Sequence, residues 1–251
     1  MSSVKDFIKR VTSVTGLNVK ESDFQTLEYK NVLRMLYIQH IIPELGKALK
    51  INPDGTYTGI KTITKEALNS KINILRSSPK YMDLFQTKPG GTGPGEIVIF
   101  LLVDKAVLSG GSKSYDITAG NLHYEVKSVN ITSNGKLYGF ATGSTVSAAQ
   151  YAMGALKELG KSLGMNITGN SINVSQLQQI RQKAPDQYND IEKIYKKGVA
   201  EYFAKHPTIF FGSQSSNSSN RGTVLCMKNV KEEDISIHEV SLNTVKPYVK
   251  A

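Results

Sequence analysis

The stretch that decides the fold, residues 115–129, reads YDITAGNLHYEVKSV. Two segments of alternating apolar and polar residues flank a glycine-asparagine pair, so the stretch predicts a β-hairpin. Residues of one parity share a face of a strand, which places Glu125 and Lys127 on one face and Tyr124 and Val126 on the other. We therefore expect one face to carry chemistry and the opposite face to pack.

A Glu-x-Lys tripeptide is weak evidence by itself, because a chain with twelve Glu and twenty-six Lys is expected to contain one by chance. Glu28-Tyr29-Lys30 has the same pattern, but it lies where the apolar spacing of residues 23–49 predicts a helix. Side chains two residues apart on a helix do not face each other. The strand context of Glu125 and Lys127 therefore carries the weight.

The residues before the hairpin extend the pattern. Gly93-Pro94-Gly95-Glu96 precedes the apolar run 97–103, Asp116 opens the hairpin, and Glu125-Val126-Lys127 completes the order. This order resembles the PD-(D/E)XK nuclease superfamily, the restriction-endonuclease-like fold, over roughly residues 90–160. The leading Pro of the family motif is absent, because Tyr115 precedes Asp116. The alternative is that these residues are solvated strand charges.

The resemblance implies an α/β fold with a restriction-endonuclease-like core, a mixed central sheet flanked by helices, and an N-terminal helical region. It also implies hydrolysis of DNA phosphodiester bonds with Mg²⁺, for which Mn²⁺ can substitute. Asp116 and Glu125 would hold the cation through the oxygen ligands that it prefers, with Glu96 as an outer or additional ligand. Lys127 is charged at neutral pH and would stabilise developing charge rather than act as a base.

Physical reasons support the place of Glu96. Pro94 suits the first turn of a helix, and the helix macrodipole favours an anion near that end. Gly95 would allow a close approach of the backbone.

Further residues are candidates for contact with nucleic acid. His123 shares the parity of the Glu-x-Lys pair, although a partly exposed histidine at a hairpin edge is the alternative. Gln150 lies where some relatives place a site glutamine, but Gly154 stands where that motif has Tyr. The remaining candidates lie on a predicted helix whose solvated face is the alternative explanation: Lys193, Lys196 and Lys197.

Charge points to the class of partner. The formal net charge is +10 and the pI is about 9.4, which favours an acidic partner such as DNA. Lysine supplies twenty-six of the thirty-one positive charges, which suits phosphate contacts more than bidentate reading of bases. Simple solubility or a lysine-rich genome would also give this balance.

Composition excludes several classes of protein. No apolar run approaches the length of a membrane span, and the N-terminus lacks the apolar core of a signal peptide. The single Cys226 cannot form an internal disulfide, and no Cys/His spacing indicates zinc. We expect a cytoplasmic protein without membrane contact, or one of the host cytoplasm if the chain is phage-encoded.

The pattern of elements predicts a mainly helical region over residues 1–87 and a nuclease-like core over 88–251, with a helical insertion at about 173–205. Helices are predicted at 4–13, 22–49, 64–77 and 144–163, with a pair over 174–205 split near Pro185. Strands other than the hairpin are predicted at 56–63, 136–140, 208–211, 223–228 and 234–240. Pro247 is expected to mark a fraying end.

Two other functions stay open. The short, lysine-rich chain and its glycine-rich segment look phage-like, so a non-catalytic DNA-binding or virion-assembly protein with phage partners is the alternative to a nuclease. A nucleotide enzyme is disfavoured, because the glycine-rich segment 88–95 lacks the Gly-Lys-Ser/Thr ending of a P-loop. Cutting both DNA strands with one site per chain would favour a homodimer.

Overall fold

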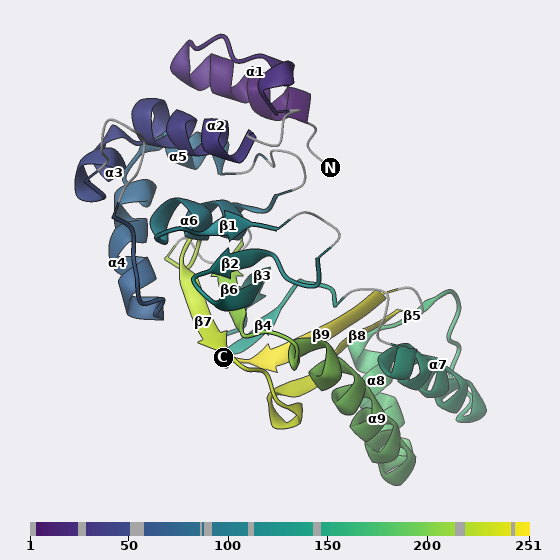
Figure 1. The fold of residues 1–251 in the computed structure, drawn as a ribbon. Helices are drawn as coiled ribbons and strands as arrows, with labels where there is room; N and C mark the ends of the chain where they lie inside the picture. Colours follow the sequence, from purple (N-terminus) through teal and green to yellow (C-terminus); the bar gives the residue numbers. More distant parts are fainter. Residues whose placement is uncertain are drawn as a thin grey trace. The chain divides into compact units, whose positions relative to one another are not determined.

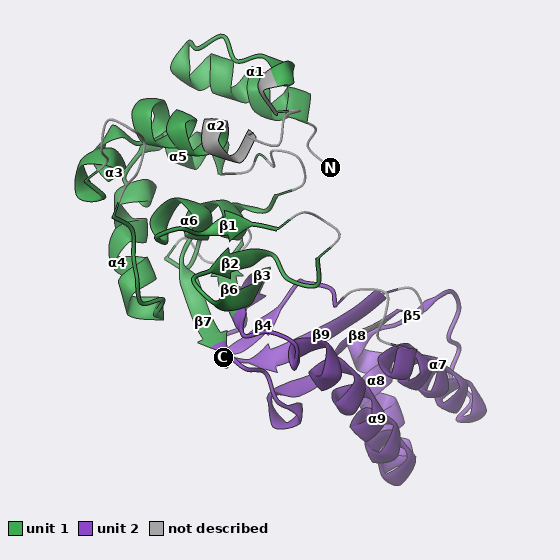
Figure 2. Cartoon of the chain, in the orientation of Figure 1, with its two compact units in different colours: residues 1–128, 209–227 green, residues 129–208, 228–251 purple. Residues whose placement is uncertain are grey.

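The computed structural model describes residues 4–24, 29–50, 58–85, 87, 92–109, 113–142, 147–213, 219–241 and 244–251. Over these residues the chain is a mixed α/β protein with an open antiparallel sheet flanked by helices. It divides into two compact units, coloured separately in Figure 2. Unit 1 comprises residues 1–128 and 209–227, and unit 2 comprises residues 129–208 and 228–251.

In unit 1, a layer of helices packs against strands through one buried helix. Its helices are α1 (Val4–Thr15), α2 (Tyr29–Leu36), α3 (Pro43–Ala48), α4 (Lys65–Arg76), α5 (Pro79–Leu84) and α6 (Pro94–Leu102). Figure 1 shows α6 with α1 and α5 on one side and strands β2 (Ile117–Ala119) and β3 (Leu122–Ile131) on the other. Every residue of α6 from Ile97 to Leu102 is buried, as expected for a helix that is apolar on all sides. One continuous apolar core therefore joins the helices to the strands.

The strands of unit 1 include the hairpin that the sequence predicts. They are β1 (Val107–Leu108), β2 (Ile117–Ala119), β3 (Leu122–Ile131) up to Ser128, β6 (Thr208–Gly212) and β7 (Val224–Lys228). Strands β2 and β3 are antiparallel, with Ala119 opposite Leu122. Gly120 has φ 61°, which fits the first central position of a type II′ turn. The hairpin prediction is confirmed, and so are the strands predicted at 208–211 and 223–228.

The single long helix predicted over residues 22–49 is wrong. The described part of this region holds a 3-10 turn at Glu21–Phe24, then α2, a π-helical turn at Tyr37–Ile41 and α3. Proline disfavours the helical conformation in the residue before it, and Ile42, which precedes Pro43, has φ −134° and ψ 67°. The apolar spacing continues through this break, so periodicity alone concealed it.

Other helices of unit 1 follow local signals. The helices predicted at 4–13 and 64–77 are confirmed as α1 and α4, and Thr64 caps α4 by accepting a hydrogen bond from the Ala67 N–H at 3.1 Å. Helix α5 was not predicted, although Ser78 caps it and Pro79 occupies its first turn. Of the strand predicted at 56–63, Ile60 forms an isolated bridge, and residues 51–57 lie outside the described residues.

The described residues of unit 2 form a sheet with α-helices and a short 3-10 helix at Glu232–Asp234. Its strands are the end of β3 from Val129, β4 (Lys136–Tyr138), β5 (Ser171–Ile172), β8 (Ile235–Ser241) and β9 (Thr244–Lys250). Its helices are α7 (Ser147–Ser162), α8 (Val174–Lys183) and α9 (Pro185–Phe203), which confirms a helical pair split at Pro185. Helices α7 and α9 pack together closely, because a Cβ on Gly198 would lie 2.9 Å from the Ala149 backbone nitrogen.

The prediction of a fraying end at Pro247 is wrong. Strand β9 pairs with β4 on one side and β8 on the other, and Pro247 is opposite Ile237. A register shift between Ile237 and Glu239 lies beside the proline. Proline cannot donate to a sheet ladder and is tolerated at such irregularities, which the sequence pattern did not reveal.

Candidate functional site

Glu125 and Lys127 lie together on one face of β3, as the alternation predicts. The Lys127 Nζ is 2.5 Å from the Glu125 Oε1, and both side chains are largely buried, at 17% and 11% exposed. Val126 between them belongs to the apolar core of unit 1. One face of the strand thus packs while the other presents a paired carboxylate and ammonium.

Asp116 is bound to the same strand through its side chain. It directly precedes β2, and its backbone N–H donates to the Tyr124 carbonyl at 3.0 Å. Its Oδ2 accepts a hydrogen bond from the Val126 N–H at 2.8 Å. The side chain therefore holds its carboxylate beside the segment that carries Glu125 and Lys127.

Glu96 reaches the cluster from the N-terminal turn of α6. Its Oε1 accepts a hydrogen bond from the Gly93 N–H at 3.0 Å, which fixes the carboxylate at the positive end of the helix dipole. Gly95 allows the helix to lie against the strands. A Cβ on Gly95 would lie 2.9 Å from the Phe211 Cβ and 3.0 Å from the Val126 Cγ1.

The four side chains influence one another electrostatically. The pKa of Glu96 is raised to about 7, chiefly by burial and also by the charges of Asp116 and Glu125, against the lowering effects of the Gly93 hydrogen bond and Lys127. Burial and then the charge of Glu125 raise the pKa of Asp116 as well, against the Val126 hydrogen bond and Lys127. The structure therefore brings all four predicted site residues into one cluster, the carboxylate-lysine cluster.

The cluster fits a hard divalent cation by the chemistry of its donors. Magnesium is commonly held by one or two carboxylates together with water and substrate phosphate. Three carboxylates beside one ammonium leave surplus negative charge, which such a cation would offset. Within the described ranges, no three or more His, Cys, Asp or Glu side chains form a group that could hold a metal ion. Two carboxylates, such as those of Asp116 and Glu125, are within the number that magnesium commonly takes from a protein.

His123 lies next to the cluster along β3 and is held in place. Its ring stacks on Tyr115 with centroids 4.0 Å apart, and its Nδ1 is 3.0 Å from the Thr118 Oγ1. The Lys113 Nζ lies 5.7 Å from the Tyr115 ring centroid. Sequence reasoning overlooked Tyr115, although its place directly before Asp116 and its alternation with Lys113 could have pointed to it.

The other candidate contacts with nucleic acid belong to unit 2. Gln150 lies on α7 and is partly buried, while Lys193, Lys196 and Lys197 lie on α9. The Lys196 Nζ is 3.5 Å from the Glu192 Oε2, and the other two lysines are exposed. Their contact with nucleic acid stays a prediction.

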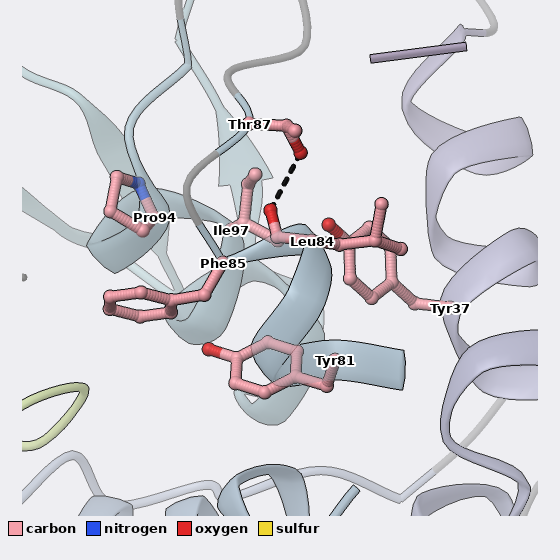
Figure 3. A pocket seen from close by; sticks show the side chains of 7 residues that line it. All are labelled: Tyr37, Tyr81, Leu84, Phe85, Thr87, Pro94 and Ile97. Atoms are coloured by element: carbon pink, nitrogen blue, oxygen red, sulfur yellow. Dashed lines mark hydrogen bonds between the residues drawn. The ribbon is translucent and has the colours of Figure 1, made fainter. Parts of the chain in front are cut away.

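A cavity near the start of α6 is too small for a substrate. Figure 3 shows the side chains around it, which are Tyr37, Tyr81, Leu84, Phe85, Thr87, Pro94 and Ile97. Its volume is about 10 Å³, near the lower limit for one water molecule. The hydroxyl of Thr87 donates to the Leu84 carbonyl at 2.6 Å beside it. We therefore assign the cavity to core packing.

Comparisons with known proteins identify no family for this chain. No protein-family model, curated protein or solved structure matches the chain. In the described part of the chain, no helix is both long and apolar enough to cross a membrane.

Proposed function

We propose that the chain is a metal-dependent deoxyribonuclease that hydrolyses DNA phosphodiester bonds, on a restriction-endonuclease-like core. One observation carries this proposal: three carboxylates and one ammonium, supplied by α6, the residue before β2, and β3, influence one another in a single partly buried cluster. Perturbed titratable groups that gather in this way are typical of functional sites, although structural ion pairs also perturb pKa values.

Asp116 and Glu125 would hold the cation, which is Mg²⁺ with Mn²⁺ as a substitute. When bound, it would polarise the phosphoryl oxygens and lower the pKa of a bound water. The Asp116 Oδ2 is engaged by the Val126 N–H, which orients the carboxylate before any ligand arrives. Glu96 would act as an outer or additional ligand, and its pKa near 7 suits it to hold a proton at neutral pH.

Lys127 would stabilise negative charge on the phosphate as the attacking water adds and the bond to the leaving oxygen breaks. Its ammonium is already held by Glu125 at 2.5 Å, so little reorganisation is needed when substrate binds. The net charge of +10 supports DNA as the partner, because a basic chain attracts a polyanion.

A nicking assay on supercoiled plasmid tests the proposal. The wild type with Mg²⁺ should convert supercoiled to open-circular DNA, and chelation by EDTA should stop the conversion. Glu125→Ala and Lys127→Ala should abolish nicking while DNA binding stays largely intact. Nicking by both variants at the rate of the wild type would show that the assignment is wrong.

A second candidate function is a non-catalytic DNA-binding or virion-assembly protein on the same fold. It is favoured by the engagement of Glu125 with Lys127 and by the finding that the described residues include no three-ligand metal group. This alternative predicts that the chain retains DNA on a filter but never nicks it, with Mg²⁺ or with Mn²⁺.

A further inference from the structure

Unit 2 carries a cluster of rings that the carboxylate-lysine cluster does not use. Tyr138, Tyr248 and His238 lie on the neighbouring strands β4, β9 and β8 (Figure 1). His238 and Tyr248 are stacked, with centroids 4.2 Å apart and planes inclined by 10°. Tyr138 lies 5.2 Å from His238 and 5.9 Å from Tyr248. We call these three residues the aromatic face.

The aromatic face lies on the side of the sheet opposite the buried core residues. Along β9, the buried Val245, Pro247 and Val249 alternate with partly exposed residues that include Tyr248. Helix α7 packs against β8 and β9, and α9 packs against β8. Since successive side chains of a strand point to opposite faces, Tyr248 lies on the face opposite the buried residues.

Two lysines flank these rings. The Lys136 Nζ lies 5.3 Å from the Tyr248 ring centroid, and Lys136 is directly opposite Lys250 in the register of β4 and β9. Within the described residues, neither lysine forms an ion pair.

The combination of rings and lysines selects a ligand class. Bases of single-stranded nucleic acid stack on aromatic side chains while their phosphates meet cationic groups. Bases in a duplex are already stacked and cannot offer their faces in this way. Strands β4, β8 and β9 contain no arginine, and lysine contacts phosphate as a point charge without reading base edges.

We propose that the aromatic face binds single-stranded DNA, with bases on Tyr138, His238 and Tyr248 and phosphates at Lys136 and Lys250. The rings are already in mutual contact, so binding orders few new side chains. The choice of DNA over RNA rests on the proposed function, whereas the stacking chemistry does not. Cross-strand ring contacts also stabilise a sheet, and a purely structural role would change stability without changing binding.

The test is fluorescence anisotropy of a labelled oligothymidylate titrated with the full-length chain in EDTA, which prevents cleavage. Tyr248→Leu and Tyr138→Leu should each weaken binding by about tenfold, since one base stacked on an aromatic side chain contributes about 1–3 kcal/mol. Tyr248→Phe keeps the ring and should bind like the wild type. Tyr151→Leu is the matched control, because Tyr151 is a 69% exposed tyrosine of α7 outside the face.

Lysine variants supply a second measurement that does not depend on the rings. Lys136→Gln should weaken binding and reduce its salt dependence, whereas Lys183→Gln on α8 should change neither. Lys136 is partly exposed, so this substitution remains informative if a tyrosine variant fails to fold.

Several outcomes would overturn the inference. These are unchanged affinity in both tyrosine variants and in Lys136→Gln, equal loss in Tyr151→Leu, or an equal loss of duplex binding in the tyrosine variants. Equal affinity for an oligouridylate would overturn the choice of DNA. If Tyr248→Leu weakens binding but the wild type shows no Mg²⁺-dependent nicking, the proposed function is wrong and the inference stands. If the wild type nicks DNA but the tyrosine variants bind the oligothymidylate as the wild type does, the inference is wrong and the proposed function stands.

Discussion

The ammonium of Lys127 lies 2.5 Å from the carboxylate of Glu125, and it is the positive charge that lowers the pKa of both Glu96 and Asp116. One ammonium therefore interacts electrostatically with three carboxylates in a partly buried cluster. The cluster therefore has a surplus of negative charge, and the sign of this surplus determines how substitutions should change the stability.

Lys127→Met should destabilise the metal-free chain more than Glu125→Gln does. The first change leaves three carboxylates without their cation, and an uncompensated buried charge costs on the order of 3 kcal/mol. The second removes one of the repelling charges and leaves Lys127 near Asp116. Urea unfolding in EDTA measures the difference. Equal losses of unfolding free energy would mean that the cluster carries no surplus negative charge.

The stability of the metal-free chain should fall as the pH rises from about 4.5 to about 7. Glu96 ionises near 4.5 when unfolded but near 7 when folded. Between these pH values the folded state binds more protons than the unfolded state, so the stabilisation present below pH 4.5 is lost progressively as the pH rises to about 7. The full effect is on the order of 3 kcal/mol. Thermal unfolding of the wild type and Glu96→Gln in EDTA checks this, and the variant should be the more stable at pH 8.

Magnesium should counter this loss. The increase in the unfolding temperature of the wild type on adding Mg²⁺ should be larger at pH 8 than at pH 6, because Glu96 is more protonated at pH 6 and its proton competes with the cation for the carboxylates of the cluster. A larger increase at pH 6 would contradict the assignment of these carboxylates to the cation.

Asp116 should separate a structural role from a chemical one. Asp116→Asn can keep an acceptor for the Val126 N–H but loses the charge, so it should fold and fail to nick DNA. Asp116→Ala leaves that N–H without its acceptor, which costs about 1–3 kcal/mol. Urea unfolding and plasmid nicking on both variants give the two readouts. Normal nicking by Asp116→Asn would limit Asp116 to holding the hairpin.

Gly95→Ala should displace Glu96 although it changes no charge. Its Cβ would lie 2.9 Å from the Phe211 Cβ, and such overpacking costs about 1–3 kcal/mol. Val126→Ala in the same chain should recover part of the lost stability and activity, because it removes the Cγ1 that would lie 3.0 Å from the added methyl group. A double mutant no better than Gly95→Ala would place the strain elsewhere.

Much of the site could be predicted because strand geometry has a strict period. The alternation of residues 122–127 sufficed to put Glu125 and Lys127 on one face, and the pair lies there. Pro94 indicated a helix start, which is confirmed, and Gly95 lets the backbone of α6 lie close to the side chains of Phe211 and Val126. The second role of Asp116, as the acceptor for the Val126 N–H, depends on three-dimensional pairing that no spacing records.

Each element that was predicted wrongly or was not predicted has a physical reason. The apolar spacing across residues 22–49 is satisfied equally by one helix or by several short ones, and the break at Ile42 depends on Pro43. Strands β1 and β5 have two residues each and exist through their partners rather than through local propensity. Pro247 was misread because its tolerance depends on an irregularity in the neighbouring strand β8.

The most direct test of the cation-binding cluster is a titration with Mn²⁺, followed by the electron paramagnetic resonance signal of the free ion. The wild type should remove Mn²⁺ from solution, while Asp116→Asn and Glu125→Gln should remove far less. Glu158→Gln, at an exposed carboxylate of α7 paired with Lys161, should behave like the wild type. Equal uptake by all four proteins would contradict the account, because the carboxylates of Asp116 and Glu125 would then not hold the cation.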